Sequence, residues 1–285
     1  MAELTIIHTI QELQTLLGRN QRQGKTVGFV PTMGFLHEGH LSLVEQARQQ
    51  NDIVVMSIFV NPAQFGPGED FEAYPRDAQR DAGLAHDAGV DILFMPTPEE
   101  MYPQEGGIRI LPGSQATELC GASRPGHFDG VLKVVLKLFN IVDPDRSYFG
   151  LKDAQQLAII ETFVRDFNLR TKIVRVPTVR EQDGLAKSSR NVHLTEAERQ
   201  EAPAIQRALQ KGALLVAEGL SAGEIEQQVA EAIVTNSTGS IDYVSLLAYP
   251  ALTKEIDQTN EVIVACAVKF SKTRLIDNII IPLKG

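Results

Sequence analysis

The chain has 285 residues, of which 43% are hydrophobic and 22% charged, as in a globular protein large enough to bury a core without disulfide bridges. Its 27 basic and 36 acidic residues give a formal charge of −9, which argues against a nucleic-acid-binding or membrane-surface protein because both need basic surface. Cys120 and Cys266 show neither metal-ligand spacing nor a disulfide framework, and neither a membrane span nor a signal peptide is visible, so we expect a cytoplasmic protein.

Strand-like and helix-like segments alternate along residues 1–179. Short apolar runs that stop at proline or polar residues predict strands, and amphipathic stretches between them predict helices. We expect strands at 27–30, 53–60, 90–95, 147–149 and 171–176, and helices at 36–50, 77–88, 131–142 and 153–167. This alternation predicts an α/β domain with a Rossmann-like parallel sheet, in which ligands bind beyond the carboxyl ends of the strands.

The composition changes near residue 180, and we place a domain boundary there, with a smaller domain at 180–285. Two helical stretches, 195–218 and 221–235, each open with a hydroxyl residue followed three positions later by glutamate, which is the sequence signature of a capping box. Three strand-like runs follow at 241–247, 262–268 and 275–281. Helices followed by consecutive strands predict an α+β domain.

Two histidines, His37 and His40, lie three residues apart where the first of these strands meets a helix. Gly39 between them would let a ligand approach the backbone, and a helix amino end attracts phosphate. Two imidazoles there could donate hydrogen bonds to a phosphate whose charge grows in a transition state. The same string also fits a capped helix with two surface or metal-binding histidines.

Four other strings could carry chemistry, although each alone also fits an ordinary turn or a solvated loop. Gly150–Asp153 combines a glycine, a mobile lysine and a helix cap, and Lys187–Arg190 combines hydroxyls with cations that bind phosphate. Asn61 and Gln64 follow a strand and could hold a polar substrate without adding charge. Arg124 lies in a Pro-Gly loop and could meet an anion.

Seven strings in order carry a resemblance along essentially the whole chain: VPTMGFLHEGH, SIFVNPAQF, YPRD, GASRPGHFDGV, YFGLKDAQQL, DGLAKSSRN and RLIDN. On these strings the chain resembles the pantothenate synthetase (pantoate–β-alanine ligase) family of the nucleotidyltransferase superfamily. The resemblance implies an ATP-dependent condensation of (R)-pantoate with β-alanine to pantothenate, AMP and diphosphate through a pantoyl adenylate, with Mg²⁺ as a cofactor. It also implies a homodimer. Because the mixed anhydride must be kept from water, we further expect the smaller domain to close as a lid.

The resemblance further implies roles for individual residues, with His40, His37 and Lys152 as catalytic residues. It implies that ATP is bound by Met33, Gly34, Phe35, Leu36, His37, Glu38, Gly39, His40, Gly150, Leu151, Lys152, Asp153, Val179, Lys187, Ser188, Ser189 and Arg190. The other substrates would meet Gln64, Gln156 and Asn61, and no residue is expected to bind a metal by itself. Leu151 and Lys187 depart from the family pattern, which often has an acidic and an apolar residue there.

Two alternatives stay open on the sequence alone. Another nucleotidyltransferase of the superfamily, acting on a different small acid, would release a stable nucleotide conjugate in place of AMP and an amide. A non-catalytic nucleotide-binding regulator would need fewer converging cationic and imidazole groups than His37, His40, Lys152 and Arg190 supply.

Overall fold

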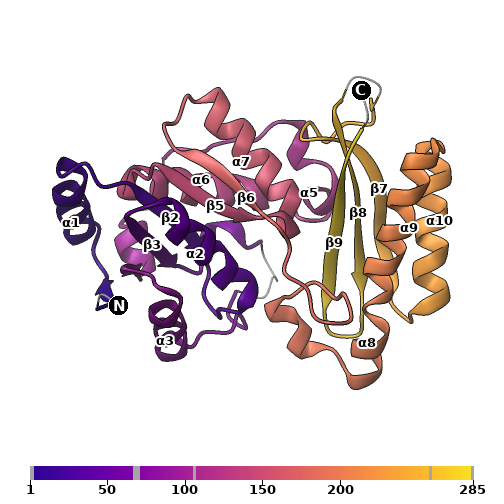
Figure 1. Ribbon diagram of the computed structural model, residues 1–285, viewed down its shortest axis with the longest axis horizontal. Helices are drawn as coiled ribbons and strands as arrows, with labels where there is room; N and C mark the ends of the chain where they lie inside the picture. Colours follow the sequence, from indigo (N-terminus) through magenta and orange to yellow (C-terminus); the bar gives the residue numbers. More distant parts are fainter. Residues whose placement is uncertain (1–2, 67–70, 105–106, 257–258, 284–285) are drawn as a thin grey trace. The chain divides into compact units, whose positions relative to one another are not determined.

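The computed structural model describes residues 3–66, 71–104, 107–256 and 259–283, which form two compact units (Figure 1). The first unit consists of residues 1–112, 124–151 and 160–177, and the second of residues 113–123, 152–159 and 178–285. Two short segments from the first part of the sequence thus belong to the second unit. A single boundary along the sequence cannot assign these two segments to the second unit, because the units are defined by contacts and not by chain order.

Within the described residues, the first unit contains a six-stranded parallel sheet, which confirms the predicted Rossmann-like fold. The spatial order is β1 (Thr5–Ile7), β4 (Ile92–Phe94), β3 (Ile53–Ile58), β2 (Val27–Thr32), β5 (Arg146–Gly150) and β6 (Lys172–Val176). β3 is buried along nearly its whole length, as expected for a parallel strand covered on both faces. The sequence pattern does not indicate β1.

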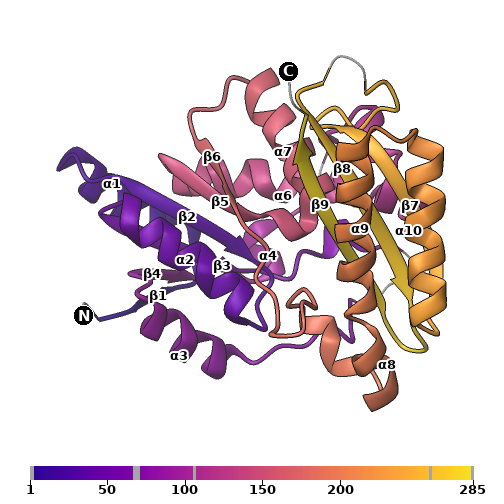
Figure 2. The same cartoon turned by 45° about the vertical axis from the view of Figure 1, so that its right-hand side comes forward.

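Helices cover both faces of this sheet, and α2 is seen along β2 and β3 in Figure 2. The α-helices that begin or lie in this unit are α1 (Ile10–Arg22), α2 (Glu38–Gln50), α3 (Ala78–Ala88), α4 (Pro98–Met101) and α6 (His127–Val142), and α7 (Ala154–Asp166) leads into β6. α2 and α3 share an apolar cluster with Val54 and Met56 of β3. α1 and α6 contact each other, and the right-handed rule for crossovers places them on the opposite face.

The order of the strands reverses between β2 and β5. The chain runs from β2 to β3 and β4 on one side of the sheet, and β5 and β6 lie on the other side. Loops that follow two such neighbouring strands leave toward opposite faces, and the crevice between them is where open α/β sheets bind ligands. The segments after Thr32 and Gly150 therefore mark the expected position of a site.

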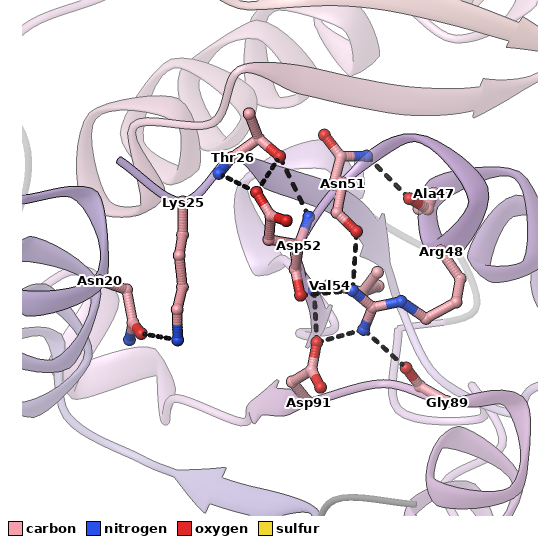
Figure 3. Close-up of polar contacts among 10 residues, drawn as sticks. All are labelled: Asn20, Lys25, Thr26, Ala47, Arg48, Asn51, Asp52, Val54, Gly89 and Asp91. Carbon is pink, nitrogen blue, oxygen red and sulfur yellow. Dashed lines mark hydrogen bonds and ion pairs between the residues drawn. The ribbon is translucent and has the colours of Figure 1, made fainter. Parts of the chain in front are cut away.

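Polar contacts tie the amino ends of the central strands at the other edge of the sheet (Figure 3). Arg48 pairs with Asp91, whose carboxylate also accepts the N–H of Val54 at 2.7 Å. Asp52 accepts both the N–H and the hydroxyl of Thr26 at 2.8 Å, and these hydrogen bonds lower the pKa of its carboxyl. Because these charged side chains pair with groups at the amino ends of neighbouring strands, they stabilise the sheet at that edge. A ligand site is therefore expected at the carboxyl edge.

In the described part of the second unit, three antiparallel strands form a sheet in the order β7 (Ser240–Tyr249), β8 (Glu261–Lys269) and β9 (Arg274–Pro282). β8 is buried on both faces. Val264 and Cys266 join the cluster formed with α9 (Ala204–Glu218) and α10 (Ala222–Asn236), whereas Ile263 packs with residues of α5 (Leu119–Ser123) and the start of α7. The alternation follows the two-residue period of a strand and confirms the predicted α+β fold.

The helical stretch predicted at 195–218 is two helices, α8 (Glu196–Glu201) and α9, because Pro203 between them has no N–H to donate to a continuous helix. Capping boxes open α8 at Thr195 and α10 at Ser221, as predicted. Four short 3-10 helices complete the described elements: η1 (Pro62–Gln64), η2 (Ser114–Ala116), η3 (Leu151–Asp153) and η4 (Ser189–His193). In the described residues, none of the helices has both the length and the apolar character to cross a bilayer.

The capping glutamate of α8 predicts a pH-dependent stability. Glu198 accepts the N–H of Thr195 and the N–H of Ser271, each at 2.8 Å, and these hydrogen bonds lower its pKa to about 2 from an ordinary value of 4.5. A lowered pKa means that the carboxylate stabilises the fold above pH 4.5 and that this contribution is lost as the pH falls toward 2.

We therefore expect Glu198→Gln to lower Tm at pH 7, and expect its difference from the parent chain to shrink as the pH falls below 4.5. Thermal melts by circular dichroism between pH 7 and about pH 3 measure this. Glu196→Gln is the matched control, because Glu196 is an exposed acid in the same first turn. A difference for Glu198→Gln that stays constant with pH would contradict the linkage.

Candidate active site

The segment from Met33 to His37 connects β2 to α2 at the carboxyl edge of the first sheet. Its backbone is left-handed at two successive residues, Gly34 with φ 86° and Phe35 with φ 50°. Glycine adopts this conformation freely, whereas at Phe35 it is strained and must be held by its surroundings. A Cβ on Gly34 would also lie 2.9 Å from the side chain of Ile58, so glycine is required for space as well.

The two histidines interact with each other and with the start of α2. Nδ1 of His37 accepts the N–H of Gly39 at 3.1 Å, and Nδ1 of His40 accepts the N–H of His37 at 3.3 Å. The ring centroids are 4.1 Å apart. Because each Nδ1 is an acceptor, a neutral imidazole at either position carries its proton on Nε2. The capping geometry thus fixes the tautomer and orientation of both rings.

Asn61 and Gln64 lie at η1, directly after β3, and both are buried. The Asn61 amide donates to Oε1 of Gln64 and to the carbonyl of Gly130, both at 3.1 Å, and its Oδ1 accepts the hydroxyl of Tyr102 at 2.9 Å. Nε2 of Gln64 lies 3.1 Å from Sδ of Met33. Asn61 therefore orients the Gln64 amide, which lies beside the turn that follows β2.

Two residues of this arrangement, Tyr102 and Gly130, were not singled out from the sequence. Burial raises the pKa of Tyr102 to about 12, so its hydroxyl keeps the proton that it donates to Asn61. Gly130 lies against η1, where a Cβ would be 2.1 Å from the carbonyl oxygen of Ala63. A glycine inside an apolar helix is a sequence signal for such close approach, whereas a lone tyrosine in a loop gives none.

Arg124 reaches this group through His127. The carbonyl of Gln64 lies 2.8 Å from Nδ1 of His127, and Nη1 of Arg124 lies 3.1 Å from its Nε2. A carbonyl can only accept and a guanidinium can only donate, so the His127 ring is neutral with its proton on Nδ1. The loop that contains Arg124 thus supports the backbone of Gln64.

The Gly150–Asp153 string at the end of β5 divides between the units, with Gly150 and Leu151 in the first and Lys152 and Asp153 in the second. Within the second unit, the carbonyl of Lys152 accepts the amide of Asn278 at 2.9 Å. Two adjacent glutamines follow. Gln155 is buried, and its amide bonds to the backbone of Cys120, Gln115 and Glu118, whereas Gln156 is only half-buried. Of the two, Gln156 is therefore the one with an accessible side chain.

The Lys187–Arg190 string follows a short hairpin in the second unit. Arg180 binds Asp277 through two hydrogen bonds of 2.6 and 2.9 Å, and the N–H of Lys187 donates to the carbonyl of Val179 at 2.9 Å. Nζ of Lys187 lies 3.1 Å from a carboxylate oxygen of Glu181, so its charge has an acidic partner within this unit. Val179 and Lys187 are thus held together by the hairpin.

Ser188 opens η4, where its hydroxyl oxygen accepts the N–H of Arg190 at 3.2 Å. Ser189 and Arg190 belong to η4 itself, and all three side chains are half-buried. The predicted site residues of the second unit therefore lie on two local structures: η3 with the start of α7, and this hairpin with η4. The structure brings the first-unit residues together at the carboxyl edge of the parallel sheet.

The first-unit group suits an anion better than a metal ion. Imidazole N–H donors lie at the amino end of a 13-residue helix, where the helix dipole favours negative charge, and neutral amides lie beside them. Among the residues that the structure describes, no three or more histidine, cysteine or acidic side chains gather as a metal site. Such a set can bind a phosphate or carboxylate through hydrogen bonds.

Comparisons with known proteins find similar proteins that match nearly the whole chain. The family model described as pantoate-beta-alanine ligase matches residues 5–280. The chain is 57% identical to a pantothenate synthetase of Bacillus velezensis, covering 96% of both chains, and 55% identical to one of Bacillus subtilis, covering 98% of this chain and 97% of the relative.

Solved structures show the same similarity. The crystal structure of a pantothenate synthetase from Thermus thermophilus has a TM-score of 0.90 and 45% identity, over 96% of this chain and 98% of that one. A pantoate-beta-alanine ligase from Francisella tularensis, solved in complex with beta-gamma ATP and beta-alanine, has a TM-score of 0.80 and 35% identity, over 97% of each chain.

The tight contact between α6 and η1 predicts a strong effect of one methyl group. In Gly130→Ala the new Cβ meets the carbonyl oxygen of Ala63 at 2.1 Å, so helix and turn must separate. We expect the free energy of unfolding to fall by about 1–3 kcal/mol, the usual range for overpacking. We also expect weaker binding of the substrate that contacts Gln64. Urea unfolding measures the first effect and substrate KM the second.

Gly83→Ala in α3 is the control for this substitution. Gly83 is also inside a helix, but nothing lies within 4 Å of its would-be Cβ. Alanine there should be neutral or stabilise the helix by up to about 1 kcal/mol. Equal stability changes at the two glycines would show that the contact with Ala63 has no energetic role.

Proposed function

Since the chain belongs to the pantoate-beta-alanine ligase family, we propose that it joins (R)-pantoate to β-alanine in two steps through an enzyme-bound pantoyl adenylate. The chain is a ligase, and its overall products are pantothenate, AMP and diphosphate. The observation that carries this function is the family match over residues 5–280, supported by the paired imidazoles at the start of α2. The same match disfavours a nucleotidyltransferase that acts on a different acid or a non-catalytic regulator.

In the first step, a carboxylate oxygen of pantoate attacks the α-phosphorus of ATP, and the bond from that phosphorus to the diphosphate oxygen breaks. A carboxylate is already a nucleophile, so no side chain has to activate it. The difficulty is repulsion between two anions, which hydrogen-bond donors and cations must offset. Mg²⁺ would supply positive charge to the phosphates, and we propose that it arrives bound to ATP, as Mg²⁺ commonly does.

We propose that His37 and His40 donate their Nε2–H groups to the ATP phosphates. Both Nδ1 atoms are occupied by backbone N–H donors, which supports this orientation. Met33, Gly34, Phe35, Leu36, Glu38 and Gly39 would bring the turn and the first N–H groups of α2 to ATP. His40 is the residue on which we expect turnover to depend most.

For the second unit we propose a role in ATP binding for its cationic and hydroxyl side chains. Lys152 would act as a mobile cation on the phosphates, beside Gly150, Leu151 and Asp153, and Val179 would contact the adenine. Ser188, Ser189 and Arg190 would bind phosphate oxygens, supported by the cap that holds Ser188 against the Arg190 N–H. Lys187 would contribute less than an unpaired lysine because Glu181 neutralises part of its charge.

We propose that Gln64 and Gln156 bind pantoate, and that Asn61 serves the same substrate by orienting Gln64. The support is the buried Asn61 amide, which contacts Oε1 of Gln64 and is itself fixed by Tyr102. Neutral amides suit this task because a further positive charge would hold pantoate too tightly for attack, and a negative charge would repel it.

In the second step, the neutral amine of β-alanine attacks the acyl carbon of the adenylate. The new C–N bond forms, the C–O bond to AMP breaks, and the amine loses a proton. Water must be excluded while the mixed anhydride is present, because hydrolysis would waste it.

We also propose that the ligase is a cytoplasmic homodimer. The two cysteines of the chain, Cys120 and Cys266, are free thiols, which suits a reducing compartment. Exposed aliphatic side chains on the first unit, Ile108 at 78% and Leu111 at 73%, give apolar surface that a second copy would cover.

The adenylate intermediate predicts a specific exchange reaction. Labelled diphosphate should enter ATP when pantoate is present and β-alanine is absent, because the first step is then reversible on the enzyme. Scintillation counting of ATP, with each substrate omitted in turn, measures this. Exchange that also demands β-alanine would exclude a separate adenylation step, and a stable nucleotide conjugate would favour the other nucleotidyltransferase reaction.

His40→Ala should lower turnover by about 100-fold or more, as the loss of a transition-state donor does. A coupled assay of AMP release measures it. His86→Ala is the control, since the His86 side chain is 42% exposed on α3 and has no proposed role in the reaction. Near-normal turnover of His40→Ala would remove His40 from the site.

A further inference from the structure

The strained turn before His37 is not held by packing alone. Met33 and Gly34 line a pocket of about 230 Å³, so the turn lacks a solid core on that side. The φ of 50° at Phe35 is unfavourable for a residue with a side chain. Specific contacts must therefore keep the backbone in this conformation, and hydrogen bonds are the contacts that the structure supplies.

One buried carboxylate accepts two of these hydrogen bonds. Asp81 of α3 is 1% exposed, and its Oδ2 accepts the N–H of Phe35 at 2.7 Å while its Oδ1 accepts the N–H of Leu36 at 2.8 Å. Two successive N–H groups thus point at one carboxylate. Charge-assisted hydrogen bonds of this length are strong, and a buried carboxylate without them would be very unfavourable.

The neighbouring residue, Arg80, binds the carbonyl side of the turn. The contacts of Asp81 and Arg80 with the turn are together called the clamp. Nη2 of Arg80 donates to the carbonyl of Leu36 at 3.0 Å, and Nη1 lies 3.4 Å from Oδ1 of Asp81. The guanidinium also lies over the Phe35 ring, 5.2 Å from its centroid. Asp81 therefore binds two N–H groups of the turn, and Arg80 binds its carbonyl at Leu36.

Asp81 is not needed to start its own helix. Asp77 already caps α3 by accepting the N–H of Arg80 at 3.0 Å. The Asp81 carboxylate is directed instead at residues 45 and 46 positions earlier in the chain. An anion close to a phosphate-binding turn would repel ATP. The presence of the Asp81 carboxylate is therefore best explained by the two N–H groups that it holds in place.

We propose that Asp81 is a positioning residue of the ligase, which fixes the turn at Phe35 and Leu36 and so sets the position of His37 and His40 for adenylation. The inference rests on the proposed role of the two histidines in binding ATP phosphates. The clamp acts on the backbone immediately before His37, whose own N–H is bonded to His40. A shift of the turn therefore moves both imidazoles together.

The main test is Asp81→Asn. Asparagine has one acceptor oxygen where aspartate has two, and its NH₂ group would face the second N–H. We expect pantoate-dependent exchange of diphosphate into ATP to fall by about 10- to 100-fold in kcat, because misplacement of catalytic groups by about 1 Å has effects of this size. The control is Asp77→Ala, which removes the cap of the same helix and leaves the clamp in place.

A spectroscopic measurement separates positioning from general destabilisation. Nitrogen-15 NMR of labelled histidines reports the Nδ1 acceptor and Nε2–H state of each ring, and single His→Gln substitutions assign His37 and His40. Asp81→Asn should shift both resonances, and Asp77→Ala should lower Tm without shifting them or reducing exchange at a temperature where it is folded. Unchanged resonances, an unchanged exchange rate, or an equal loss of rate in Asp77→Ala would each overturn the proposal.

If Asp81→Asn does not fold, Arg80→Gln weakens the same clamp from a side chain that is 45% exposed, and it should shift the same resonances and lower exchange several-fold; no change in either would overturn the proposal. If the parent chain shows no pantoate-dependent exchange, the proposed function fails. The histidine resonances then still decide whether Asp81 positions the rings.

Discussion

The backbone turn between β2 and α2 is the constraint on which the candidate site depends. It must place two N–H groups, two imidazoles and a helix amino end at one edge of the sheet, and it does so through left-handed residues that a chain avoids when left alone. The strain is tolerated because Thr32, Asp81 and Arg80 satisfy the polar groups of the turn. Strain balanced by hydrogen bonds is a common way to preorganise a reactive site.

Hydrogen bonds also fix the neutral polar residues near this turn. Asn61 is almost completely buried, yet its amide has partners in Gln64, Gly130 and Tyr102. His127 is held between Gln64 and Arg124 with one tautomer, whereas His37 and His40 are held in the other. Backbone groups set these tautomers, and the tautomer decides which nitrogen can donate to a ligand. The chemistry of the site therefore follows from main-chain geometry as much as from side-chain identity.

Much of the fold was predictable because it depends on short-range patterns. Buried strands appear as apolar runs, and the capping boxes at Thr195 and Ser221 act over three residues. The sequence pattern does not indicate β1 because a strand of three residues is too short to show a period. α1 does follow a helical period through Ile10, Leu13 and Leu17, and is a helix that the expected elements leave out. The break at Pro203 was visible in the sequence, since proline ends a helix, but the composition on both sides suggested one long helix.

The local parts of the site can be identified from the amino-acid sequence: two imidazoles three residues apart after a buried strand, and a hydroxyl-rich cationic string. The distant groups that support these parts become visible in the folded chain. The contact from Tyr102 to Asn61 spans 41 positions and that from Asp81 to Leu36 spans 45, and segments 113–123 and 152–159 join the second unit. A sequence pattern reports periodicity and caps, which act within a few residues. Hydrogen bonds between distant segments depend on how the sheet brings those segments together, and no local pattern encodes that.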